Sequence, residues 1–132
     1  MEIEITLNFI DAINTHNMGK LTDLMTDDHI FVDTLGRRLR GKEKIHEEWQ
    51  KFLDVFPDYM VSVTDMIQRG DVIGIFGRAS GTYTLKGKPV SDGHWEIPAA
   101  WKAIVKDGRI ALWQIIADFE PVRQIKARLD GA

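Results

Sequence analysis

The part of the chain after Pro57 reads as a succession of four β-strands. Each segment is rich in β-branched and aromatic side chains, and short turn sequences that contain glycine separate the segments. Asp107-Gly108 is the strongest of these turn signals, because both central residues of a type I′ hairpin turn take a positive φ. The order therefore predicts an antiparallel meander. Its four strands are expected at residues 59–68, 72–85, 94–105 and 109–119.

The part of the chain before Pro57 carries helical patterns instead. Apolar residues at the spacing of one helix face predict a helix over residues 3–15, and Asn17 is placed to cap a second, short helix. The third helix has the clearest apolar stripe, which ends where Pro57 stops the helix. The three expected apolar faces consist of Ile3, Leu7, Ile10 and Ile13, of Leu21, Leu24 and Met25, and of Ile45, Trp49, Phe52, Leu53 and Phe56.

Shorter segments complete the pattern. Residues 29–32, HIFV, predict a small strand between the second and third helices. The arginine-rich residues 37–40 are interpreted as a solvated turn, with attraction of an anionic ligand group as the alternative. Pro121 suits the first position of a helix in the tail. Helices on one face of an antiparallel sheet define an α+β domain.

The composition narrows the function classes. A chain of 132 residues suits one domain, residues 1–132, and the absence of cysteine excludes disulfides and thiolate chemistry. The formal net charge of −3 argues against nucleic-acid binding. No apolar run is long enough to span a membrane, and the acidic N-terminus does not resemble a signal peptide. We therefore expect a cytoplasmic protein that binds neither nucleic acid nor membrane.

Two of the predicted strands are apolar on both faces. In residues 73–79 and 110–117, hydrophobic side chains occupy odd and even positions alike. One face of the sheet is needed to cover the helices, so the other face requires a cover of its own. We expect a homodimer that forms through the outer face of the sheet. Packing of the tail helix against the strands is the alternative.

The chain resembles the SnoaL-like and ketosteroid-isomerase-like branch of the nuclear-transport-factor-2-like superfamily over essentially its whole length. The segments FIDAINTHNMGKLTDLMTDD, HIFVDTLGRRLRGKEKIHEEWQKFLDVFPD and KDGRIALWQIIADFEP carry the resemblance. It implies a cone-shaped, cystatin-like α+β fold, with N-terminal helices packed in a strongly curved mixed or antiparallel sheet around an apolar pocket. The family includes isomerases, polyketide cyclases, epoxide hydrolases and dehydratases, so the fold alone does not define the reaction.

Asp33 is the first candidate catalytic residue. The resemblance places it where family members often keep a pocket carboxylate, which is the general base in the isomerases. A carboxylate at the mouth of an apolar cavity is partly desolvated, and desolvation raises its pKa toward the range useful for proton transfer. The alternative is a turn aspartate that accepts hydrogen bonds from its own backbone.

Asp118 and His94 are the second and third candidates. Asp118 follows an almost wholly apolar strand, and the resemblance favours a pocket role there. The alternative is a cap for the tail helix, although Glu120 is the preferred cap. His94 can change charge near neutral pH and shares a strand face with Glu96, whereas an exposed loop histidine is its alternative.

Aromatic residues are the candidate ligand contacts. Four tryptophans in 132 residues are a large number, and core filling is the first interpretation of any one of them. Aromatic walls with few polar groups are, however, typical of apolar ligand pockets. We expect no metal and no cofactor, because His94 and Glu96 supply at most two of the three ligands a metal requires and the chain has no glycine-rich phosphate loop. The expected substrate-binding residues are Phe31, Trp49, Phe52, Tyr59, Trp101 and Trp113.

Two functions follow from this reading. The first is a cofactor-independent enzyme, an isomerase, cyclase or hydrolase, that acts by acid–base catalysis on an apolar ring-containing or polyketide-like molecule. Asp33 would be its base, and Asp118 and His94 would act as acids or hydrogen-bond partners. The second function is a ligand-binding or dimerisation module of the same fold without turnover.

Overall fold

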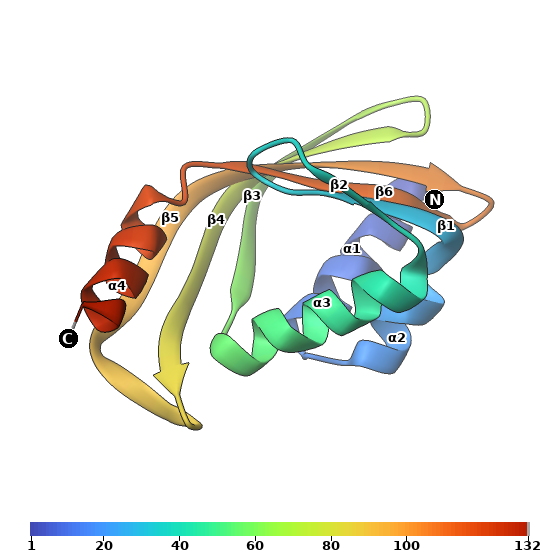
Figure 1. The fold of residues 1–132 in the computed structure, drawn as a ribbon. Helices are drawn as coiled ribbons and strands as arrows, with labels where there is room; N and C mark the ends of the chain where they lie inside the picture. The colour runs from blue at the N-terminus through green and yellow to red at the C-terminus, as the bar shows by residue number, and fades with distance from the viewer. Residues whose placement is uncertain (132) are drawn as a thin grey trace.

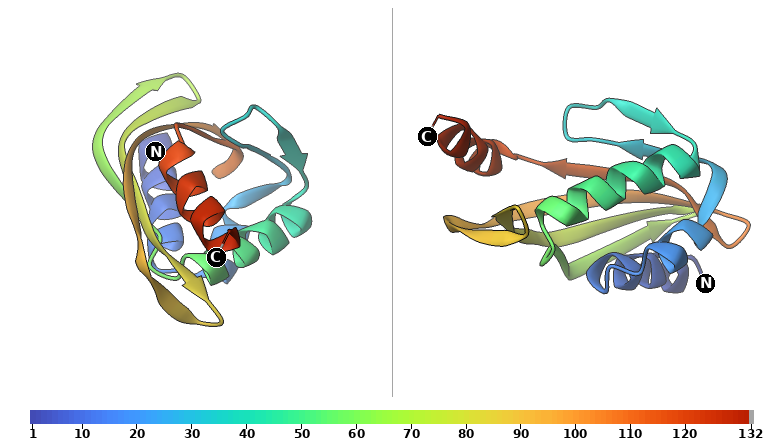
Figure 2. Two further views of the ribbon diagram at one scale, coloured as in Figure 1. Left: turned by 60° about the vertical axis from the view of Figure 1, so that its left-hand side comes forward. Right: turned by 60° about the horizontal axis from the view of Figure 1, so that its bottom comes forward.

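The computed structural model describes residues 1–131 as a six-stranded sheet with the N-terminal helices packed on one face (Figure 1). A fourth helix, α4, lies near one end of the long strand β5, whereas α1 and α2 lie toward the other end (Figure 2). The elements are α1 Glu2–Asn14, α2 Met18–Asp23, β1 Met25–Val32, β2 Arg38–Arg40, α3 Lys42–Val55, β3 Met60–Arg69, β4 Val72–Leu85, β5 Lys88–Lys106, β6 Arg109–Ala117 and α4 Glu120–Asp130.

The sheet is mixed, with the strand order β2-β1-β6-β5-β4-β3. The predicted meander is confirmed as β3 to β6, and both residues of the Asp107-Gly108 turn have a positive φ, as expected. The parallel pairing of β1 with β6 could not be predicted from local patterns, because the two strands lie far apart in the sequence. The interpretation of residues 37–40 as a turn alone was wrong, since Arg38–Arg40 form the edge strand β2.

Helix α1 buries Ile10 and Ile13 as predicted, but its buried face is shifted toward Phe9 and away from Leu7. Phe9 is completely buried and packs on Trp113, with 4.9 Å between the ring centroids, and Ile13 is also completely buried. Leu7, which was expected in the apolar stripe, is 44% exposed. It lies about 200° around the helix from Phe9, so burial of the larger phenylalanine turns Leu7 toward solvent.

The second and third helices form as predicted, although α2 ends at Asp23, so that Met25 of its expected face lies in β1. The Asn17 side chain accepts a hydrogen bond from the Lys20 backbone N–H, at 3.1 Å, and thereby caps α2. Helix α3 buries Ile45, Trp49 and Leu53, and ends just before Pro57. The α+β class with N-terminal helices and a mixed sheet is therefore confirmed, while the strong curvature that the resemblance implies stays a prediction.

Among residues 1–131, no helix is both long enough and apolar enough to cross a membrane.

Candidate functional site

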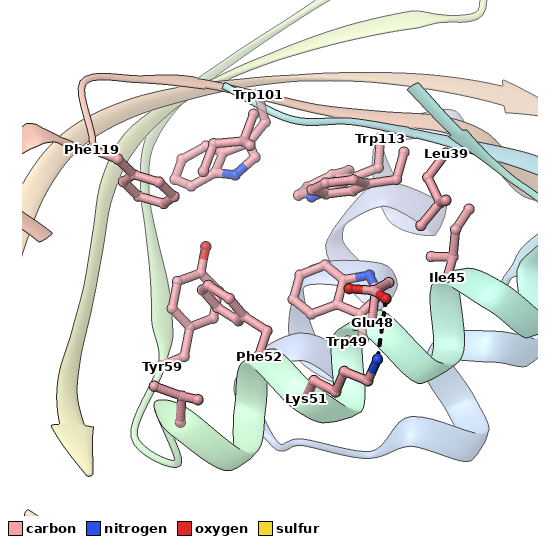
Figure 3. Close-up of a pocket in the computed structure, with 13 residues that line it drawn as sticks. Leu39, Ile45, Glu48, Trp49, Lys51, Phe52, Tyr59, Trp101, Trp113 and Phe119 are labelled. Carbon is pink, nitrogen blue, oxygen red and sulfur yellow. Dashed lines mark ion pairs between the residues drawn. The ribbon is translucent and has the colours of Figure 1, made fainter. Parts of the chain in front are cut away.

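A pocket of about 360 Å³ lies between α3 and the inner face of the sheet (Figure 3). Residues spaced three or four apart on α3 form one wall, because this spacing places them on one helix face. Trp113 and Ile115 alternate along β6 and therefore point to the same side of the sheet, as Trp101 of β5 does. The lining comprises Phe31, Leu39, Ile45, Glu48, Trp49, Lys51, Phe52, Val55, Tyr59, Trp101, Trp113, Ile115 and Phe119.

All six residues expected to contact a ligand line this pocket. Their convergence follows from the fold: α3 supplies Trp49 and Phe52, and the sheet supplies Trp101 and Trp113 on the opposite side. Trp49 and Phe52 meet edge to face, with centroids 6.0 Å apart, as is common for packed aromatic rings. That these residues bind a substrate stays a prediction.

The phenol of Tyr59 is the main polar group inside the pocket. Its hydroxyl points into the cavity toward the space between Trp101 and Phe119 (Figure 3). Within residues 1–131, this hydroxyl has no hydrogen-bond partner. Burial raises the pKa of the Tyr59 hydroxyl, so the group is neutral and can donate a hydrogen bond at physiological pH.

Two charged side chains lie at the rim of the pocket rather than inside it. Glu48 and Lys51 are one turn apart on α3, with 3.6 Å between Oε1 and Nζ, and both side chains are more than half exposed. Sequence reasoning did not identify Glu48 as a site residue, because a glutamate on an amphipathic helix normally belongs to the solvated face. It is the only carboxylate among the lining residues.

Asp33 does not line the pocket. It lies in the β1–β2 turn, where Oδ1 accepts hydrogen bonds from the backbone N–H groups of Leu35 and Arg37, each at 2.9 Å. Oδ2 pairs with the Arg37 guanidinium at 2.8 Å. This is the turn arrangement that was the alternative interpretation.

The expectation of a raised pKa for Asp33 was wrong. Partial burial acts to raise this pKa, but the hydrogen bonds from Arg37 and Leu35 and the charge of Arg37 outweigh it, so that the pKa is lowered. A carboxylate that is held in its charged form is a poor proton acceptor. The role of Asp33 as a general base stays an untested prediction that this geometry does not favour.

Asp118 lies between β6 and α4 and is exposed. Its Oδ1 accepts a hydrogen bond from the Glu120 backbone N–H at 2.9 Å and lies 3.8 Å from the Arg123 guanidinium. The preference for Glu120 as the cap was wrong, because the Glu120 side chain instead pairs with Arg123. Asp118 thus supports the start of α4 and is not among the lining residues.

His94 lies on the outer face of β5, exposed to solvent. The Thr82 hydroxyl donates to Asp58 Oδ2, at 2.6 Å, and lies 2.9 Å from His94 Nδ1. Because the hydroxyl has a single hydrogen, Nδ1 must carry the proton that joins the two side chains. Glu96 shares this face, as expected, and pairs with Arg78. His94 therefore belongs to a network on the side of the sheet that faces away from the pocket.

His29 is a buried histidine in β1 that the sequence analysis did not single out. It is completely buried, and its Nδ1 lies 2.6 Å from the Ile110 carbonyl oxygen, whereas Nε2 has no partner within residues 1–131. Burial lowers the pKa of His29, although the Ile110 carbonyl and the nearby Asp28 act against this shift. His29 shares its strand face with Phe31, an alternation that could have identified it as inward-facing.

No group of three or more histidine, cysteine, aspartate or glutamate side chains within residues 1–131 is arranged to hold a metal ion.

Solved structures share this fold across almost the whole chain. A candidate SnoaL-like polyketide cyclase from Shewanella denitrificans superposes with a TM-score of 0.83 at 17% identity, covering 96% of this chain and 97% of that one. A protein of ketosteroid isomerase-like fold from Catenulispora acidiphila, in complex with trimethylamine, gives 0.79 at 22% identity, covering 94% and 92%. At these identities the likeness establishes the fold alone.

Family membership rests on the sequence match. None of the curated proteins matches the chain. Residues 7–113, which include every helix and strand from α2 to β5, match the model of the SnoaL-like domain. The resemblance that the helix and hairpin segments carried is thereby confirmed, and the chain belongs to the SnoaL-like domain family, with a nuclear-transport-factor-2-like fold.

Proposed function

We propose that this protein binds a neutral, apolar, ring-containing small molecule in the pocket between α3 and the sheet. The observation that supports the proposal is the lining itself: seven of its thirteen residues are aromatic, and the charged pair Glu48–Lys51 lies at the rim. A volume of about 360 Å³ falls within the range of pockets that enclose small organic ligands. A polyketide-like ligand is consistent with the structural likeness to candidate polyketide cyclases.

The structure supports ligand binding better than it supports acid–base catalysis by the three predicted catalytic residues. Asp33 and Asp118 hold local turns, and His94 lies on the opposite face of the sheet. A catalytic base must come within hydrogen-bond reach of the proton it removes, directly or through one water. Isomerase, cyclase or hydrolase activity is a second candidate function. The observation that favours it is Glu48, whose carboxylate lies at the pocket rim and could act as the base.

An alkylammonium ligand is the alternative chemistry for this pocket. The similar protein from Catenulispora acidiphila contains trimethylamine, and aromatic walls attract cations through the negative faces of their rings. In this chain the one carboxylate of the lining, Glu48, lies at the rim and is paired with Lys51, so no free negative charge balances a cation in the cavity. Titration with tetramethylammonium distinguishes a site for neutral ligands from a site for cations. The proposal predicts that tetramethylammonium shows no saturable binding.

Quenching of tryptophan fluorescence by 9-fluorenone, a flat neutral tricyclic ketone, tests the proposal. Three of the four tryptophans line the pocket, so a bound ring system must change their emission. We expect saturable quenching that the substitution Leu39→Trp abolishes, because a larger side chain at this lining position fills the cavity.

Leu35→Trp is the matched control for that experiment. Leu35 is 67% exposed in the neighbouring β1–β2 turn and is not a lining residue, so its substitution should leave the quenching intact. Equal quenching in both variants would place the ligand outside the pocket and contradict the proposal.

We also propose that the outer sheet face forms a homodimer. Phe76 and Ile116 are 44% and 54% exposed and flank Ala100 in one row across β4, β5 and β6. Helix α4 leaves this row uncovered, so the expected cover is a second copy. Sedimentation should give a dimer for the native chain and a monomer for Ile116→Lys, and a monomeric native chain would contradict the proposal.

A further inference from the structure

Three hydrogen-bond donors converge on the pocket, and each belongs to a deeply buried side chain. Tyr59 presents its hydroxyl from the α3 side, and the indole nitrogens of Trp101 and Trp113 face the cavity from the sheet (Figure 3). The two indoles are stacked, with centroids 6.4 Å apart and ring planes 28° from parallel. Their exposed fractions are 3%, 2% and 1% in this order, so the pocket is the only space that these polar atoms meet.

None of the three donors has a hydrogen-bond acceptor within residues 1–131. They differ in this from the indole nitrogens of Trp49 and Trp95, which also lack partners but are enclosed by protein atoms. A donor that stays unpaired in an apolar environment carries the cost of its lost hydration, and a ligand that supplies the acceptor recovers part of this cost. The pocket therefore contains three hydrogen-bond donors that are available to a ligand.

The pocket offers few acceptors deep inside to match these donors. The carboxylate of Glu48 is at the rim and is engaged with Lys51. The Tyr59 oxygen is the one side-chain acceptor among the deeply buried lining residues, and a phenol accepts less readily than a carboxylate. A ligand donor that entered this space would meet the N–H groups of two indoles, and the Tyr59 hydroxyl could accept from it only by turning its own hydrogen away.

We propose that the pocket selects ligands whose buried edge carries acceptor oxygens and no donors, such as aromatic ketones and diketones. Tyr59 and the indole pair of Trp101 and Trp113 are the specificity-determining residues, since the site rejects a ligand that leaves its buried donors unpaired. This inference rests on the proposed ligand-binding function and adds the polarity that the ligand must have.

Three tricyclic probes of matched shape test this selectivity. 9-Fluorenone carries a carbonyl acceptor, fluorene carries neither donor nor acceptor, and carbazole carries one N–H donor. We expect 9-fluorenone to bind about 2- to 12-fold more tightly than fluorene, the range that one hydrogen bond of ordinary net strength supplies. Carbazole should bind no better than fluorene. Carbazole binding as tightly as 9-fluorenone would overturn the inference.

Tyr59→Phe removes one donor and keeps the ring. It should lower the affinity for 9-fluorenone by about 2- to 12-fold and leave the affinity for fluorene unchanged. Tyr83→Phe is the matched control, because Tyr83 is a half-buried tyrosine that does not line the pocket. An equal loss for both probes in Tyr59→Phe would show a packing defect and contradict the assigned role.

The carbonyl stretching band of bound 9-fluorenone provides a readout independent of affinity. A hydrogen bond to the carbonyl should shift this band to lower wavenumber in the native protein, and the shift should shrink in Tyr59→Phe. If fluorene and 9-fluorenone bind equally and the band does not move, the inference on polarity fails while ligand binding stands. If none of the three probes binds, both the inference and the proposed function are wrong.

Discussion

The two faces of β5 and β6 differ in how their polar groups are used. On the inner face, Trp101 and Trp113 are buried beside a cavity and leave hydrogen-bond donors unpaired. On the outer face, His94 is linked through Thr82 to Asp58, and Glu96 is paired with Arg78. Paired polar groups stabilise loops and strands, whereas unpaired donors beside an empty space are available to a ligand. The comparison supports the proposal of a ligand site on the inner face.

Trp113→Ala is expected to have the largest effect. Trp113 is 1% exposed and contacts Phe9 of α1 as well as Trp101, so its truncation removes part of the core and enlarges the pocket. Chemical denaturation should show a loss of about 3–5 kcal/mol in the free energy of unfolding. Ile116→Ala, on the outer face of the same strand, should lower the free energy of unfolding much less. Equal losses in the two variants would contradict the difference between the two faces.

The buried His29 should make stability depend on pH. Its pKa is lowered in the folded state, so the unfolded chain binds a proton more readily and stability falls as the pH drops below about 6.5. One proton contributes at most about 1.4 kcal/mol per pH unit to this slope. Denaturation at pH 7 and pH 5 measures the change in the free energy of unfolding with pH. The same measurement on His29→Gln, whose side chain cannot titrate, is the comparison. An unchanged slope in the variant would exclude His29 as the cause.

Asp33→Asn should destabilise the β1–β2 turn by about 1 kcal/mol or less, because its partner Arg37 is largely exposed. The pKa of Asp33 is lowered in the folded state, so this contribution is present above the unfolded pKa of about 3.9 and is lost as the pH falls through the folded value. Denaturation at pH 7 and pH 3 should therefore show a larger difference between native and variant chains at pH 7 than at pH 3. Binding of 9-fluorenone should be unaffected.

His94→Ala is expected to have the smallest effect. His94 is exposed and its network serves the outer rim of the sheet, so the free energy of unfolding should change by about 0.5 kcal/mol or less. Ligand affinity should equal that of the native chain in the same fluorescence titration. A clear loss of affinity would restore His94 as a site residue and would require the pocket to extend beyond the inner face.

The pocket walls could be predicted from the sequence, whereas the polar candidates could not be placed. Trp49 and Phe52 lie on a strongly periodic helix, and Trp101 and Trp113 lie on strands with clear turn signals, so their inward direction follows from local patterns. The direction of Asp33 depends on a five-residue turn closed by Arg37, and that of His94 depends on pairing with Thr82 of another strand. Such contacts are set by tertiary structure and leave no periodic signal.

The exposure of Leu7 and the burial of His29 show the same limit of prediction from local patterns. Leu7 fits a helical stripe, yet Phe9 occupies the buried side and turns Leu7 toward solvent. His29 is the first residue of the predicted strand 29–32, and the parallel pairing of β1 with β6 encloses it. Local patterns identify the elements, whereas the competition among large side chains and the long-range strand pairing decide which residues are enclosed.

A crystal structure of the protein with bound 9-fluorenone tests the central claim most directly. The account predicts ligand density between Trp49 and Phe52 of α3 on one side and Trp101 of β5 on the other, with the carbonyl oxygen within hydrogen-bond distance of the Tyr59 hydroxyl. Density beside Asp33 or His94, or on the outer face of the sheet, with an empty pocket would contradict the account.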